Sequence, residues 1–254
     1  MTDAELRPYI CAWRNIKYGY ELREYNRKGF FSLLFGVRRK KHPKKQKKFH
    51  ASTHFLRIRE NDQEHTYMVL KIYLECSVLC PSCFPINDRI VRMIMDHEYD
   101  EIAMGGDSLD DGSYDKDKKN EIGIKFAEAS YDGYPEELQK SYIEDLMSFQ
   151  GEVGCQAYAA DKFEFAMSLV YRIMRGASPS LISNKIYDNK KSRKKSNDEV
   201  YRDKIKSDYS HDVVFAATLY KTRDIPGRRA LIILMELAYR DAGLAIPEGV
   251  YAYY

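Results

Sequence analysis

The strongest folding pattern in this chain lies in residues 226–243, which begin with a proline and end with a glycine. Proline is favoured in the first turn of a helix, and glycine is favoured just beyond its last turn. Between them, apolar residues recur every three or four positions, as they do on one face of a helix. These residues are Leu231, Leu234, Met235 and Ala238. The pattern predicts a helix over 226–242 with one buried face.

Weaker forms of the same pattern predict helices over 135–149 and 161–175, and a short charged helix over 198–206. Pro135 is well placed to begin the first of these, and Gly176 to end the second. The second half of the chain is therefore predicted to be mainly helical.

Two helices are predicted in the first half. Thr2 and Glu5 have the spacing of a capping box, and the apolar residues after them predict a helix that ends before Gly29. Residues 89–96 form the second, which Asn87 or Asp88 can cap. Each prediction joins a capping residue to an apolar stripe that follows it.

Strands are predicted where β-branched and aromatic residues gather. Residues 54–59 and 65–74 have this composition on either side of the turn sequence ENDQE, which predicts an antiparallel hairpin. Shorter strands are predicted over 101–104, 213–220 and 250–254, with a helix as the alternative for 213–220. The expected fold class is α+β, with an early antiparallel hairpin and a mainly helical C-terminal half. A mixed region, 1–130, and a helical region, 131–254, are expected to pack as one globular unit.

Composition places the chain among ordinary globular proteins, with 44% hydrophobic and 31% charged residues. No stretch is apolar for long enough to span a membrane, and the N-terminus lacks the basic and apolar segments of a signal peptide. We therefore expect a cytoplasmic protein without a membrane span, whose five cysteines stay reduced.

The sequence ECSVLCPSCF places three of these cysteines, Cys76, Cys80 and Cys83, within eight residues. Three thiolates can share a soft metal such as zinc if a fourth ligand completes a tetrahedron. The histidines nearest in sequence are His50, His54, His65 and His97. The alternative is a packed turn in which Cys76 ends a buried strand and the other two cysteines pack as small apolar residues.

The cysteines also resemble the start of a radical S-adenosylmethionine enzyme, because a predicted helix, a short strand and Gly105-Gly106-Asp107 follow them. The resemblance implies an iron–sulfur cluster held by Cys76, Cys80 and Cys83. It also implies that the double glycine and its acid meet the amino group of the methionine. An iron–sulfur cluster is therefore an alternative to zinc at this loop.

Basic residues gather in two runs, RRKKHPKKQKK at 38–48 and NKKSRKK at 189–195. Lys and Arg bind the phosphate backbone of nucleic acids by displacing counterions, and regular structure is not needed. The residues expected to make these contacts are Arg38, Arg39, Lys40, Lys41, Lys44, Lys45, Lys47, Lys48, Lys190, Lys191, Arg193, Lys194 and Lys195. The pattern predicts contact with nucleic acid but does not distinguish DNA from RNA.

Acidic residues are concentrated in 96–117, which holds nine Asp and Glu against one Lys. Within it, 107–117 could hold Mg²⁺ or form a solvated loop. The apolar run FFSLLFGV, which starts at Phe30 and ends at Val37, could instead bind a protein partner.

The leading functional hypothesis is a nucleic-acid-contacting protein within a larger complex. The alternative is a metal-dependent enzyme that uses the cysteines or the acidic segment. The sequence shows no P-loop, no dinucleotide-binding fingerprint and no nucleophile elbow.

Overall fold

The computed structural model describes residues 1–34, 62–99, 116–176 and 211–246, and within these ranges the regular elements are all α-helices. The helices are α1 (Asp3–Leu34), α3 (Asp62–Leu79), α4 (Asp88–Asp96), α6 (Lys116–Ser130), α7 (Glu136–Met147), α8 (Cys155–Met174), α11 (His211–Lys221) and α12 (Arg228–Asp241). None of these described helices is both long and apolar enough to cross a membrane.

The predicted α+β fold with its hairpin is wrong for this part of the chain. Residues 65–74, predicted as a strand, lie inside α3. Residues 213–220 lie inside α11, so the helix given as the alternative to a strand is the one that forms there. The other predicted strands, at 54–59, 101–104 and 250–254, fall outside the described residues.

The burial pattern of α3 shows why it forms a helix. The residues that α3 buries completely are Met68, Val69, Ile72, Tyr73 and Cys76. They recur with the period of a helix, whereas a half-buried strand would bury every second residue. The strand prediction relied on the β propensity of single residues, which is a weaker guide than the period of the buried face.

Substitutions at Val69 and Tyr67 test this assignment. In a strand the two side chains would share one face, but in α3 Val69 is fully buried and Tyr67 is 48% exposed. We expect Val69→Ala to lower the free energy of unfolding by roughly 2 kcal/mol and Tyr67→Ala to change it by less than about 0.5 kcal/mol. Urea denaturation of both variants measures the difference. Equal losses would contradict the helix.

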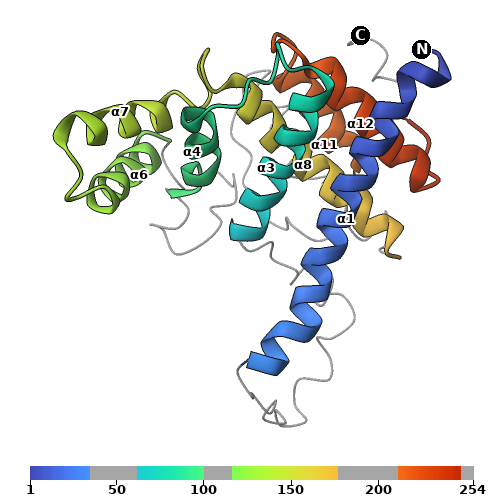
Figure 1. The fold of residues 1–254 in the computed structure, drawn as a ribbon, viewed down its shortest axis with the longest axis horizontal. Helices are drawn as coiled ribbons and strands as arrows, with labels where there is room; N and C mark the ends of the chain where they lie inside the picture. The colour runs from blue at the N-terminus through green and yellow to red at the C-terminus, as the bar shows by residue number, and fades with distance from the viewer. Residues whose placement is uncertain (35–61, 100–115, 177–210, 247–254) are drawn as a thin grey trace, which may run out of the picture.

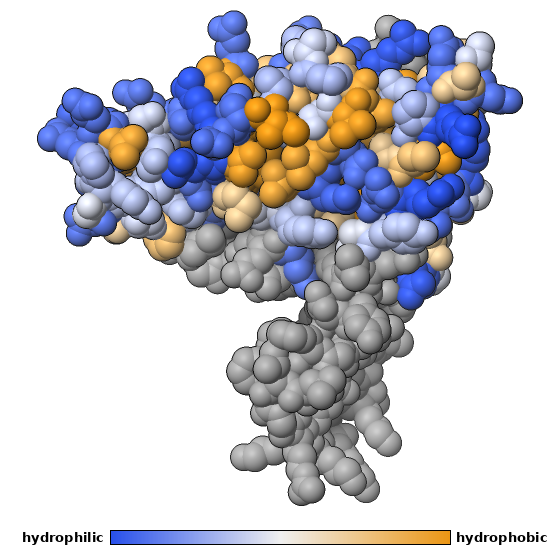
Figure 2. Space-filling view, in the orientation of Figure 1, coloured by the Kyte–Doolittle hydropathy of each residue, from blue (hydrophilic) through white to orange (hydrophobic). Residues whose placement is uncertain are grey.

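The long helix α8 lies at the centre of the fold, where it contacts α1, α3, α4, α11 and α12 (Figure 1). Most of its side chains are buried, as expected for a helix enclosed by others. On one side, α4 leads to α7 and α6, which form the outlying end of the molecule (Figure 1). In the same view, Figure 2 shows apolar residues gathered in the middle of the face, around α3, and mainly hydrophilic residues over α6 and α7.

Several predicted helix ends are confirmed. The side chain of Asn87 accepts a hydrogen bond from the backbone N–H of Ile90 and caps α4. Thr2 and Glu5 form the reciprocal bonds of a capping box at the start of α1. The helices predicted over 135–149 and 226–242 correspond to α7 and α12.

Other boundaries differ from the predictions. α1 continues past Gly29 to Leu34, so the apolar run 30–37 begins inside a helix. α8 begins at Cys155, six residues before the predicted start at 161. α6 begins at Lys116, within a stretch whose composition is typical of turns. Residues that favour turns can still form a helix when that helix packs against a neighbour, as α6 does against α7.

Candidate metal centre

Three helical segments bring two histidines and two acids to one point. His65 lies in the first turn of α3, His97 and Glu98 follow the last residue of α4, and Asp161 lies in α8. One ligand atom from each residue lies within 4.8 Å of the others. Their side chains are between 4% and 15% exposed, so the group is largely withdrawn from water.

The facing atoms are the Nε2 nitrogens of the histidines and one oxygen of each acid. The two Nε2 atoms are 3.3 Å apart. Nε2 of His65 lies 3.0 Å from Oδ1 of Asp161 and 3.3 Å from Oε1 of Glu98. Nε2 of His97 lies 2.9 Å from Oε1 of Glu98 and 4.0 Å from Oδ1 of Asp161. Both imidazoles thus present the same nitrogen to the two carboxylates.

The other ring nitrogen of each histidine has a different partner. Nδ1 of His97 lies 2.7 Å from the backbone carbonyl oxygen of Ile94. A carbonyl oxygen only accepts, so Nδ1 of His97 carries a proton. Nδ1 of His65 lies 2.8 Å from Oε2 of Glu164, which is fully buried. In the neutral tautomers that donate these two bonds, both Nε2 atoms carry lone pairs that face the centre of the group.

Buried side chains hold these orienting groups in place. The hydroxyl of Tyr20, from α1, lies 3.1 Å from Oε1 of Glu164. The ring of His97 stacks on Phe149 with centroids 5.0 Å apart. Nζ of Lys162 lies 2.6 Å from Oδ2 of Asp161, the oxygen that faces away from His65. The positions of His65, His97 and Asp161 are therefore set by their surroundings as well as by each other.

The charges of His65, Glu98 and Asp161 shift one another's pKa values. Burial by itself lowers the pKa of His65, but hydrogen bonds to Asp161, Glu164 and Glu98 raise it well above the ordinary value. Burial raises the pKa of Glu98, but its bonds to His65 and His97 outweigh this and hold the pKa far below the usual range. The pKa of Asp161 is also far below its usual range, because Lys162 and His65 outweigh its burial. The carboxylates are ionised and the site favours a positive charge.

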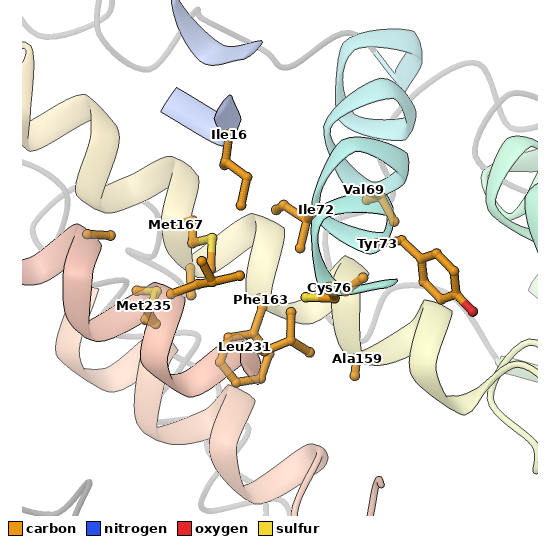
Figure 3. Close-up of a cluster of buried hydrophobic side chains, with 14 of the residues drawn as sticks. Ile16, Val69, Ile72, Tyr73, Cys76, Ala159, Phe163, Met167, Leu231 and Met235 are labelled. Carbon is orange, nitrogen blue, oxygen red and sulfur yellow. The ribbon is translucent and has the colours of Figure 1, made fainter. Parts of the chain in front are cut away.

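The three predicted cysteine ligands do not all face one way. Cys76 is fully buried, and its side chain points into the core beside Phe163 and Leu231 (Figure 3). Burial raises the pKa of its thiol well above the ordinary value, which opposes thiolate formation. Cys80 and Cys83 are half-buried in the turn after α3. Within the described ranges, the group able to hold a metal includes none of these cysteines. Zinc or an iron–sulfur cluster at the cysteines stays a prediction.

Cys80 and Cys83 are linked by a side-chain hydrogen bond. This bond lowers the pKa of Cys80 and raises the pKa of Cys83.

Gly227 lies against the turn that contains Cys83, and a Cβ at Gly227 would come within 2.5 Å of the Cβ of Cys83. With φ at 79°, Gly227 also has a backbone conformation that other residues rarely adopt.

Most of the other predicted site residues lie outside the described part of the chain. These are the basic residues of 38–48 and 190–195, His50 and His54, and the motif 105–107. The acidic segment is described only at its two ends, in 96–99 and 116–117. The proposed contacts of these residues with nucleic acid, magnesium or a radical-enzyme substrate stay predictions.

Sequence reasoning considered His65 and His97 only as partners of the cysteines, and it missed Glu98, Asp161 and Glu164 as site residues. A pattern in α8 could have found two of them. Asp161 and Glu164 are three residues apart on the face of α8 that also buries Phe163 and Ala160. Acids on an otherwise apolar buried face need partners, which makes them candidates for a functional site.

A scan against models of protein families, a search of curated proteins and a search of solved structures each found no match.

Proposed function

We propose that His65, His97, Glu98 and Asp161 bind one divalent transition-metal ion and that the protein is a metal-dependent hydrolase. One observation carries the proposal. Both imidazoles turn Nε2 toward the same two carboxylates, while both Nδ1 atoms are occupied by oxygen acceptors. Histidine ligands of metals commonly have this arrangement, in which the second ring nitrogen donates to a carboxylate or a carbonyl.

The facing lone pairs favour a cation at the centre. A neutral His97 holds its proton on Nδ1, and its Nε2 then faces the ionised Glu98 at 2.9 Å and His65 at 3.3 Å. Two lone pairs and two carboxylates at such distances repel unless a positive charge lies between them. A protonated His65 would supply that charge in the absence of metal, and a divalent ion would replace its Nε2 proton and satisfy all four groups.

The donor atoms indicate the class of metal. Four separations between them lie between 2.9 and 3.3 Å, and the one between His97 and Asp161 is 4.0 Å. Because two ligands of one ion at about 2.1 Å can be no more than about 4.2 Å apart, these atoms are close enough together to contact a single ion. Two imidazoles and two carboxylates suit divalent transition metals such as Mn²⁺, Fe²⁺, Co²⁺ or Ni²⁺.

A divalent metal held by these four residues would supply the chemistry of metal-assisted hydrolysis, because it would lower the pKa of a bound water and polarise the bond to be broken. Glu164 would keep Nδ1 of His65 protonated and its ring in place, and Ile94 would do the same for His97. Contact of the basic runs with nucleic acid is a separate proposal that rests on the sequence alone.

Metal binding is tested on the full chain after treatment with a chelator. We expect Mn²⁺, followed by isothermal titration calorimetry, to bind with a stoichiometry of one. Saturation should also raise the melting temperature. A ligand that binds only the folded protein adds about 2.7 kcal/mol of stability when its concentration is 100 times its dissociation constant.

Activity is tested with a panel of ester and amide substrates, which should show turnover only after metal is added. Absence of binding by Mn²⁺, Fe²⁺, Co²⁺, Ni²⁺ and Zn²⁺ would overturn the proposal.

A further inference from the structure

The side chain of Lys162 lies directly beside the proposed ligands. Lys162 follows Asp161 in α8, and its ammonium group lies 2.6 Å from Oδ2 of Asp161. The other oxygen of the same carboxylate, Oδ1, faces His65. The ammonium also lies 5.1 Å from the centre of the Tyr158 ring. The side chain of Lys162 is 32% exposed, whereas that of Asp161 is 9% exposed. Lys162 therefore lies between the buried cluster and solvent.

Within the part of the chain that the structure describes, the ammonium group of Lys162 does not use all of its hydrogen-bond donors. It carries three N–H donors, and within the described residues its only ion-pair or hydrogen-bond acceptor is Asp161. The ring of Tyr158 attracts the positive charge without accepting a conventional hydrogen bond. Among the described residues, donors therefore remain for a ligand that reaches the metal from the solvent side.

The charge of the centre depends on this lysine. Among the described residues, a divalent ion would have three carboxylates near it, those of Glu98 and Asp161 and, behind His65, that of Glu164. Without Lys162 the centre would carry one net negative charge and would repel an anion. With Lys162 it is neutral, and the positive charge lies on the side that solvent reaches. An anionic substrate is then attracted to the metal and the ammonium together.

We propose that Lys162 binds the phosphoryl group of a phosphate ester, which bridges its ammonium and the metal. This inference rests on the proposed hydrolase function and names its substrate class. A phosphoryl group has several oxygens, so one can occupy an open metal position while another accepts from Lys162. Lysine and a metal ion acting together are a common means of stabilising the charge that develops on a transferring phosphoryl group.

The reaction is balanced with water as the only co-substrate. The oxygen of water forms a bond to phosphorus, the P–O bond to the leaving group breaks, and a proton from water ends on the leaving oxygen. One ester and one water therefore give phosphate and an alcohol from a monoester, or a phosphate monoester and an alcohol from a diester. No oxidant or reductant is needed.

The test measures metal and phosphate binding separately, on the full chain and on Lys162→Met. Mn²⁺ titration establishes metal occupancy. Inorganic phosphate is then added, and its binding is followed by the paramagnetic broadening of its ³¹P resonance. We expect both proteins to bind Mn²⁺, and the phosphate dissociation constant to rise at least about tenfold in Lys162→Met.

Two further variants are controls. Lys162→Arg, which keeps the charge, should retain phosphate binding. Lys125→Met, which removes a surface lysine paired with Glu121, is the control and should match the unmodified chain.

The outcomes separate the two proposals. Equal phosphate affinity in Lys162→Met and the unmodified chain, both loaded with Mn²⁺, would overturn the role of Lys162 and leave the metal centre intact. Failure of the unmodified chain to bind metal would instead overturn the hydrolase. Hydrolysis assays with p-nitrophenyl phosphate, bis(p-nitrophenyl) phosphate and p-nitrophenyl acetate complete the test. The first two distinguish monoesters from diesters, and a larger rate enhancement over the uncatalysed reaction for the acetate than for both phosphates would overturn the phosphoryl assignment.

Discussion

Replacing Asp161 by asparagine is expected to abolish metal-dependent hydrolysis while leaving the protein folded. The change keeps the size of the side chain but removes the negative charge that faces His65 at 3.0 Å and Lys162 at 2.6 Å. Replacing residues that only orient metal ligands typically costs 10–100-fold in affinity or activity, so loss of a ligand should cost at least about 100-fold. Mn²⁺ titration and turnover of the preferred ester measure the two losses.

Asp145→Asn is the matched control for this variant. Asp145 lies in α7, is also buried and also pairs with a basic residue, Arg89, at 2.5 Å. It is not a member of the His65–Asp161 cluster. Its replacement should therefore leave metal stoichiometry and turnover unchanged. Full Mn²⁺ affinity in Asp161→Asn would show that the proposed ligand set is wrong, and equal losses in both variants would show that the effect comes from the fold.

Replacing Phe163 by alanine is expected to cause the largest loss of stability among single changes in α8. Phe163 is fully buried at the centre of the core (Figure 3). Its ring meets that of Phe215 in α11 edge to face, with centroids 6.3 Å apart. Removing a buried phenylalanine costs about 3–5 kcal/mol, because transfer free energy is lost and a cavity remains. Urea denaturation monitored by circular dichroism measures this loss.

Phe165→Ala is the control in the same helix. Phe165 is two residues away and 37% exposed, so its replacement should cost about 1 kcal/mol or less. Because Phe163 lies between Asp161 and Glu164 in sequence, Phe163→Ala should also weaken Mn²⁺ binding, whereas Phe165→Ala should not. Similar unfolding free energies for the two variants would contradict the central position assigned to α8.

The helices that sequence reasoning predicted correctly share one property. At α4, α7 and α12 an apolar stripe at helical spacing coincides with a residue suited to begin a helix, such as Asn87, Pro135 or Pro226. α3 has the stripe without an obvious start, and its β-branched and aromatic residues favoured a strand when considered one by one. Propensity failed there because packing against α1 and α8 decides the conformation.

The candidate site was harder to predict than the helices, because its residues are far apart in the chain. His65, His97 and Asp161 come from three different segments, and no short motif joins them. The three cysteines formed a visible motif, but Cys76 belongs to the buried face of α3 and lies in the core. The closeness of cysteines in sequence therefore did not predict a shared centre, since a helix turns successive side chains in different directions.

The sequence by itself determined the local structure of α7, α12 and most of α8, because helical periodicity and capping residues act over a few turns of chain. It also determined which residue types were present for metal chemistry. Only the tertiary structure decided that α3 is a helix and that His65, His97, Glu98 and Asp161 meet beside Lys162. The physical reason is that these contacts form when α3, the end of α4, and α8 pack together, and the burial that drives this packing depends on residues distant in the chain.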